Sequence, residues 1–247
     1  MQNWWRNYFA DDFFHLHKDL FPEADSRAEV SAMLELLGLP AGSRLLDVPC
    51  GWGRHTILLA EAGFDVTGAD LSHQLLSRAP RRDAADHLRG YAACDIRALP
   101  FADASFAAAI NVFTSLGLFL NDADDLSALR EIRRVLVADG VFLLESMHRD
   151  DVVADYAERD QWTLPDGTEV RVRRRFDPVT GISEEKLRWQ RGNERGQKRH
   201  ALKLRTATEI DALLSAAGFS NIAYYGDWNG SPFTHRSEHL IAVAYAG

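Results

Sequence analysis

The chain of 247 residues is 46% hydrophobic and 26% charged, the composition of a globular protein large enough to bury a full core. Its formal net charge of −8 argues against tight, sequence-independent binding of nucleic acid and favours a small-molecule substrate. No run of about 18 apolar residues is present and the N-terminus lacks the layout of a secretory signal, so we expect a cytoplasmic protein with no membrane partner. Cys50 and Cys94 do not have the number or spacing of a zinc site, and we expect no metal.

Residues 2–21 are dense in aromatic side chains. These rings either pack on the main core or form a lid over a pocket, and the sequence leaves both interpretations open. We expect residues 1–40 to form an aromatic helical cap. Three of its rings are predicted to contact a substrate: Trp5, Tyr8 and Phe9.

Strands and helices alternate in the next part of the chain. Apolar runs predict five strands, at 43–48, 64–70, 90–94, 106–112 and 141–146. Helical periodicity predicts helices at 26–37, 54–62 and 122–137, the first opening on a capping box of Ser26 and Glu29. This alternation is typical of an α/β protein with a parallel sheet that is covered by helices on both faces.

The pattern changes from about Trp162 to Arg205, where polar and apolar residues alternate and turn signals recur. Such alternation predicts antiparallel hairpins with a solvated basic face. Thr206 and Glu209 then form a capping box for a helix that ends at Gly218. Two closing strands, 219–225 and 239–245, flank a polar and aromatic loop that is either a pocket wall or a surface turn.

The run from Asp47 to Gly53 joins a strand to a helix through two glycines, Gly51 and Gly53. Such a turn lets the main chain approach a ligand, and the N-terminus of the following helix offers free N–H groups. A dinucleotide fingerprint requires a third glycine, where this chain has Thr56. Asp47, Asp70 and Asp95 each fall at or near a strand end, the edge at which open parallel sheets bind ligands.

Three strings in this region, D-V-P-C-G-W-G-R-H, V-T-G-A-D-L-S and A-C-D-I-R-A-L-P-F, resemble the class I methyltransferases that use S-adenosylmethionine and release S-adenosylhomocysteine. The resemblance implies that Asp47 faces the amino acid end of the cofactor, that Asp70 holds the ribose and that Asp95 accepts from the adenine amine. The further residues that it places in the cofactor site are Pro49, Gly51, Gly53, His55, Leu71, Ile96, Asn111, Val112 and Phe113. Pro49 departs from the family pattern, because many members have a glycine there.

The resemblance also implies a Rossmann-like seven-stranded sheet, mostly parallel with the last strand antiparallel, within a single domain over 1–247. Residues 41–150 form the cofactor-binding half, 151–205 an antiparallel insert and 206–247 the closing helix and strands. The insert is compatible with a lid, a homodimer surface, or both.

The overall pattern resembles bacterial small-molecule methyltransferases, so the expected reaction is methyl transfer to an N or O atom of a small molecule. His148, just past the fifth strand, is the predicted base, with His235 and Asp227 as substitutes. Trp228 and Arg236 complete the predicted substrate contacts. Three alternatives stay open: an NAD-dependent oxidoreductase, a non-catalytic cofactor-binding module and a nucleic-acid methyltransferase.

Overall fold

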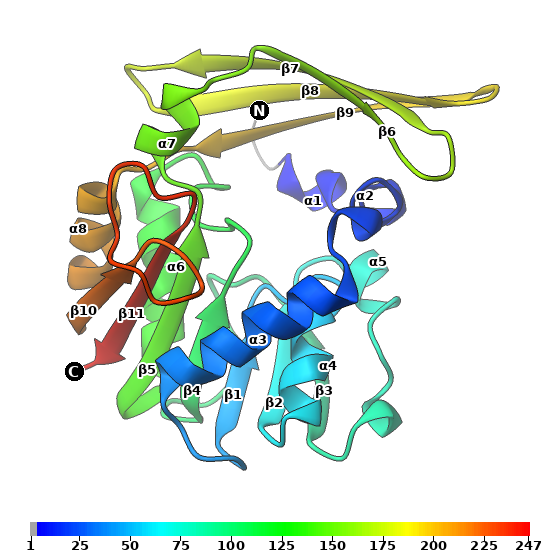
Figure 1. The fold of residues 1–247 in the computed structure, drawn as a ribbon. Coiled ribbons are helices and arrows are strands. Elements are labelled where there is room, and N and C mark those ends of the chain that lie inside the picture. Colours follow the sequence, from blue (N-terminus) through cyan, green and yellow to red (C-terminus); the bar gives the residue numbers. More distant parts are fainter. Residues whose placement is uncertain (1–3) are drawn as a thin grey trace.

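The computed structural model describes residues 4–247, and its centre is a seven-stranded sheet (Figure 1). Its strands are β1 (Arg44–Asp47), β2 (Asp65–Asp70), β3 (Leu88–Ala93), β4 (Phe106–Asn111), β5 (Leu136–Ser146), β10 (Phe219–Tyr225) and β11 (Leu240–Ala246). They lie in the order β10-β11-β5-β4-β1-β2-β3. β1 to β5 pair in parallel, whereas β11 is antiparallel to both of its neighbours, which confirms the predicted sheet.

Helices cover both faces of this sheet. α3 (Glu23–Leu37) and α4 (Arg54–Glu61) pack on one face, and α6 (Asp122–Val135) and α8 (Ala207–Ala217) pack on the other. Short helices complete the chain: α1 (Trp5–Tyr8), α2 (Asp11–His17), α5 (His73–Leu76) and α7 (Arg149–Ala154), with 3-10 turns at Lys18–Leu20 and Arg82–Ala84. No helix within residues 4–247 is long and apolar enough to cross a membrane.

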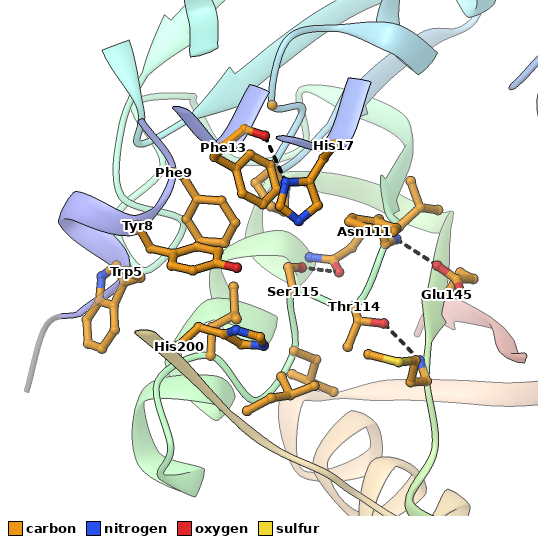
Figure 2. Close-up of a pocket in the computed structure, with 18 of the residues that line it drawn as sticks. Trp5, Tyr8, Phe9, Phe13, His17, Asn111, Thr114, Ser115, Glu145 and His200 are labelled. Atoms are coloured by element: carbon orange, nitrogen blue, oxygen red, sulfur yellow. Dashed lines mark hydrogen bonds between the residues drawn. The ribbon is translucent and has the colours of Figure 1, made fainter. Parts of the chain in front are cut away.

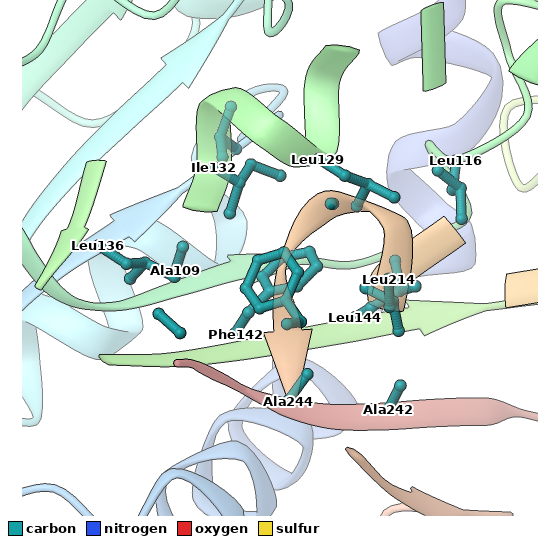
Figure 3. Close-up of a cluster of buried hydrophobic side chains, with 14 of the residues drawn as sticks. Ala109, Leu116, Leu129, Ile132, Leu136, Phe142, Leu144, Leu214, Ala242 and Ala244 are labelled. Carbon is teal, nitrogen blue, oxygen red and sulfur yellow. The ribbon is translucent and has the colours of Figure 1, made fainter. Parts of the chain in front are cut away.

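The core between α6, α8 and the sheet is built from aliphatic side chains around Phe142 (Figure 3). The Phe142 ring stacks on Phe219 with 5.2 Å between ring centroids. Ile132 on α6 and Leu214 on α8 have no exposed surface and close the same cluster. This packing covers β5 and β11, which are paired as antiparallel strands, and β5 carries part of the site at its carboxyl end.

Ile132→Val is expected to lower the free energy of unfolding by about 1 kcal/mol, because it removes one methylene from a fully buried position. Urea unfolding measures this difference. Val179→Ala, at a side chain that is 92% exposed, serves as the control and is expected to leave stability unchanged within error. An equal loss in both variants contradicts the core assignment.

A second, four-stranded antiparallel sheet consists of β6 (Arg159–Thr163), β7 (Glu169–Asp177), β8 (Ile182–Arg191) and β9 (Glu194–Lys203). It lies across the carboxyl ends of the main sheet, with α1 and α2 beneath it (Figure 1). Leu16 of α2 packs with Val170, Val172 and Leu187 under this sheet, and Lys198 pairs with Asp12. A buried ion pair between Arg205 and Asp125 joins the end of the insert to α6.

Two predicted boundaries are wrong. α3 begins at Glu23 rather than Ser26, and the Ser26 hydroxyl donates to the Pro22 carbonyl instead of capping the helix. Glu29, the predicted capping partner, pairs with Arg54 and His55. β5 begins at Leu136, where the expected helix over 122–137 has just ended. The earlier start of α3 agrees with Pro22 at the N-cap and the acidic first turn of Glu23 and Asp25. The early start of β5, by contrast, comes from pairing of Leu136 with Phe106, a long-range contact.

Candidate active site

A cavity of about 800 Å³ lies between the carboxyl ends of the parallel strands and the second sheet. Its floor is formed by the residues that follow β1, β2, β3 and β4, with Glu145 near the end of β5. Its roof is formed by α1, α2 and the inward face of β7, β8 and β9. Figure 2 shows Trp5, Tyr8 and His200 on this side of the cavity. Parallel strands bring loops that are distant in sequence to this one edge.

The glycine turn after β1 forms one wall. Gly51 and Gly53 have φ angles of 56° and 75°, which favour glycine. A Cβ on Gly53 would lie 2.7 Å from the Tyr91 hydroxyl, so a side chain at this position would displace the Tyr91 ring. Pro49 and Gly51 line the cavity, whereas Gly53 lies behind the lining and starts α4. The turn therefore exposes backbone to the cavity, as the sequence predicts.

Asp70, at the end of β2, braces this turn. One carboxylate oxygen accepts from the Gly51 N–H at 2.8 Å and the other from the Ser72 N–H at 2.7 Å. Burial raises the pKa of Asp70, while these backbone hydrogen bonds lower it. Asp70 and Leu71 both line the cavity, so the carboxylate is held rigidly where a ligand hydroxyl would reach it.

Asp47 lies beneath the floor and does not line the cavity. It is 1% exposed, accepts from the Thr56 hydroxyl at 2.5 Å through one oxygen, and has no partner for the other. Burial raises the pKa of this carboxyl to about 6, and the nearby His55 and Arg54 oppose that rise. An unsatisfied buried acceptor under the glycine turn favours a cationic group bound above it.

Asp47→Asn is expected to stabilise the ligand-free protein by about 2–3 kcal/mol at pH 7.5 and by much less near pH 4. The folded protein holds this proton up to about pH 6 and the unfolded chain only to 3.8, so stability falls as pH rises through that window. Urea unfolding at both pH values tests this. Asp139→Asn, which removes an exposed carboxylate, is the control and is expected to keep the wild-type pH dependence of stability. If Asp47→Asn also keeps that pH dependence, the raised pKa is wrongly assigned to Asp47.

His55 and Asp95 have protein partners. The His55 ring is buried at the start of α4 and lies 2.7 Å from Glu29, although its edge reaches the cavity lining. Asp95 forms a two-point ion pair with Arg97, with Nη2 at 2.7 Å and Nε at 3.0 Å, and this pairing lowers its pKa. Asp95 and Ile96 line the cavity, so one carboxylate would serve both Arg97 and a ligand.

The end of β4 brings Asn111, Val112 and Phe113 to the cavity. Phe113 has a φ of 65°, and its N–H donates to Glu145 at 2.6 Å. Glu145 also meets His239 at 2.9 Å, a contact that raises the pKa of His239. The Ser115 hydroxyl donates to the Asn111 side chain (Figure 2). These bonds fix the floor next to the methyl-transfer position that the resemblance implies.

The N-terminal helices bring Trp5, Tyr8 and Phe9 to the cavity, as the sequence predicts. Residues 1–3 of the predicted cap lie outside the described residues. Phe13 and Phe21 extend the aromatic roof, and Phe21 meets Phe113 edge-on at 4.7 Å. The aromatic segment packs on the rest of the protein and also covers the pocket, so packing and a lid over the pocket are not alternatives here.

His17 was missed from the sequence. Its ring stacks on Phe13 at 4.1 Å, and Nδ1 donates to the Phe13 carbonyl at 2.8 Å. A carbonyl only accepts, so Nδ1 carries the proton and Nε2 of the neutral ring is an acceptor. Burial lowers the pKa of His17 below 6.5, which keeps the ring neutral at pH 7. Figure 2 shows the ring on the cavity side of α2, facing Asn111.

The second sheet adds a polar group that was also missed. Glu185 of β8 lies in the roof, 2.8 Å from the Arg174 guanidinium and 3.3 Å from Nδ1 of His200. Its charge acts on both Tyr8 and His17. The alternating pattern of these strands predicts two faces, but only the docked sheet shows which one faces the cavity.

His148 lies outside the cavity, contrary to its predicted role as the base. Its ring is fully buried, its Nε2 is 2.6 Å from the Ser237 carbonyl, and it packs against Phe233. The predicted loop contacts are absent from the lining as well, namely Asp227, Trp228, His235 and Arg236. Asp227 accepts from the backbone of its own turn. Glu238 and His239, at the far end of the same loop, reach the cavity instead.

Residues 45–140 match the family model described as a methyltransferase domain. The chain carries a methyltransferase domain. A putative methyltransferase of Bacillus subtilis (strain 168), YqeM, is 31% identical over 129 residues, which are 50% of this chain and 52% of that protein. The chain thus spans about half the length of the curated relatives it matches.

Solved methyltransferase structures are similar to nearly the whole chain, including the elements that form the roof of the cavity. CcbJ methyltransferase from Streptomyces caelestis has a TM-score of 0.81 over 97% of this chain and 98% of its own, at 16% identity. SAM-bound CalS10, an amino pentose methyltransferase from Micromonospora echinaspora, has a TM-score of 0.68 over 92% of both chains, at 25% identity. The fold is that of the class I methyltransferases that use S-adenosylmethionine.

Proposed function

We propose that the chain transfers a methyl group from S-adenosylmethionine to a nitrogen or oxygen atom of a small-molecule acceptor. One observation carries this proposal: a single cavity joins the floor at Gly51 and Asp70 to a roof of aromatic and acidic side chains. The floor suits the cofactor and the roof suits an acceptor. A cavity of about 800 Å³ lies within the ~300–1,000 Å³ usual for ligand pockets and is too small to receive a nucleic acid duplex.

The residues present fit this cofactor. Asp70 has oxygen lone pairs beyond its two backbone contacts for ribose hydroxyls, and Leu71 offers an apolar contact to adenine. The buried charge of Asp47 lies under the turn that would hold the amino acid part, where it favours an ammonium group. When bound, S-adenosylmethionine supplies an electrophilic methyl group. An NAD-dependent oxidoreductase fits less well, because Thr56 replaces the third glycine and donates to Asp47.

The chain's own residues then exclude water, orient the acceptor and accept a proton. The aromatic roof closes over the floor, and such enclosure and orientation contribute about 7–11 kcal/mol in well-aligned reactions. His17 replaces His148 as the proposed base, because its Nε2 is an acceptor on the cavity side. A protonated acceptor must lose one proton before its nitrogen can attack, and Nε2 of His17 receives it.

An amine acceptor is favoured over an alcohol. Among the described lining residues, eight are Asp or Glu and three are Arg. Arg97 and Arg205, behind the lining, neutralise Asp95 and Asp125, and the remaining excess of carboxylates favours a cation. Aromatic faces add cation–π attraction. CalS10 is described as an amino pentose methyltransferase, which agrees with this preference.

An acceptor panel tests the proposal, with S-adenosylhomocysteine formation as the readout. Primary and secondary amines, including amino sugars, are expected to give product, and matched alcohols and carboxylates are not. Calorimetry with S-adenosylhomocysteine and with NAD checks the floor independently, and binding of NAD alone contradicts the cofactor assignment. Binding of S-adenosylhomocysteine without turnover of any panel member supports the non-catalytic alternative, and product from alcohols alone overturns the amine preference.

A further inference from the structure

The second sheet has a face that the methyl-transfer site does not use. Arg174, Glu185 and His200 point to the cavity, so the residues on either side of each point away from it. Eight basic residues lie on this opposite face, which we name the outer cationic face: Arg159, Arg171, Arg173, Arg175, Lys186, Arg188, Arg195 and Arg199. Two acidic residues share it, Glu169 and Glu184. Lys203 and Asp177 have the same orientation in the last row of these strands, but Lys203 pairs with Asp122 of α6, so we leave this row out of the outer cationic face.

Strand register places the basic residues directly opposite one another. Arg159 pairs with Arg173, Arg173 with Lys186, and Lys186 with Arg199, which makes one row of four cations across all four strands. A neighbouring row pairs Arg171 with Arg188. Like charges directly opposite one another destabilise a sheet. Repulsion among these cations therefore lowers the stability of the sheet, and packing of the sheet does not require charged residues at these positions.

Internal ion pairs offset little of that cost. Within residues 4–247, the only ion pair on this face joins Arg171 to Glu169, at 3.2 Å. Arg188, Arg199 and Arg173 lower the pKa of Lys186, as expected for unneutralised neighbours. Protection of sheet edges does not account for the pattern, because β7 and β8 are interior strands of this sheet.

The size of the face limits its partner. Strands lie about 4.8 Å apart and rise about 3.3 Å per residue, so the face covers roughly 15 by 20 Å. The rest of the chain holds 20 of the 28 basic and 34 of the 36 acidic residues, a net charge of −14 against +6 on the face. A long polyanion or an anionic membrane extends beyond the face and meets that negative charge within a Debye length of about 8 Å. A second copy packed through the same face would oppose like charges.

We propose that the outer cationic face docks a compact acidic protein surface. Seven of its eight cations are arginines, whose planar guanidinium groups bind carboxylates through two parallel hydrogen bonds. A footprint of this size matches the carboxylates on one face of an acidic helix. The face is the back of the strands that hold Glu185 and His200, so a docked partner would lie against the roof of the cavity.

Binding of a short poly-L-glutamate peptide tests the proposal, with a short DNA duplex and phosphatidylserine vesicles as parallel probes. The full chain is expected to bind the peptide, with affinity that falls as salt is added. R173E/K186E/R199E is expected to weaken binding about tenfold or more. The matched control, K18E/R81E/R130E, makes the same change in net charge at exposed sites elsewhere and is expected to stay within about threefold.

R173Q/K186Q/R199Q guards against misfolding, because it removes the charges and relieves their repulsion. It is expected to unfold at the wild-type temperature or above and still to lose peptide binding. Hydrogen exchange is expected to show peptide protection confined to β6–β9. The proposal fails if the peptide does not bind, if the reversal variant and its control bind it equally, or if DNA or vesicles bind more tightly than the peptide through these residues.

Discussion

Asp70→Ala is expected to lower the affinity for S-adenosylhomocysteine about 100-fold, measured by calorimetry. A hydrogen bond to a charged acceptor contributes about 1.5–3 kcal/mol, so loss of both ribose contacts costs about 3 kcal/mol or more. The variant also frees the Gly51 N–H that the carboxylate now accepts at 2.8 Å. Asp70→Ala therefore removes two things at once: the proposed ribose contact and the hydrogen bond that supports the glycine turn.

Ligand chemistry separates these two effects. The wild-type protein is expected to bind an S-adenosylhomocysteine analogue without ribose hydroxyls about 100-fold more weakly than the parent, whereas Asp70→Ala binds both equally. Ser77→Ala, an exposed hydroxyl after α5, is the matched control and is expected to bind like wild type. If the wild-type protein binds the analogue and S-adenosylhomocysteine with equal affinity, the ribose assignment is wrong, even if Asp70→Ala binds both poorly.

The floor of the site could be predicted because it depends on local signals and one topological rule. Asp70 and Asp95 each follow an apolar strand, and parallel strands bring their carboxyl ends to one edge. The glycines between Asp47 and Thr56 identify the turn without any distant contact. The carboxylate of Asp47 lies under the floor rather than on it, a depth that sequence spacing does not encode.

The roof could not be predicted because it depends on how separate segments dock. Glu185 and His200 lie in strands that alternate cleanly, yet the choice of inward face is made by Leu16 and its apolar partners under the sheet. His148 follows β5 as the sequence suggested, but the Ser237 carbonyl, 89 positions away, holds its ring outside the cavity. Both outcomes follow from long-range contacts.

His17→Asn is expected to slow turnover about 10²–10⁴-fold with the best amine from the panel, while affinity for S-adenosylhomocysteine stays within about threefold. The amide nitrogen of Asn offers a donor for the Phe13 carbonyl, so the substitution removes the acceptor nitrogen more than the local structure. His15→Ala, two residues away on another side of α2 and paired with Asp166, is the matched control and is expected to keep wild-type turnover. His148→Gln is expected to do the same.

The pH profile distinguishes a base from a packing residue. His17 must be neutral to accept a proton, and its pKa lies below 6.5, so wild-type kcat is expected to rise with pH up to that range and then level off. The acid limb is expected to vanish in His17→Asn, because the variant has no group there to protonate. NMR of the imidazole nitrogens gives a readout without turnover, with Nδ1 protonated and Nε2 free at pH 7. A retained acid limb in His17→Asn, or an Nε2-protonated ring, assigns the proton to another group and leaves His17 a structural role.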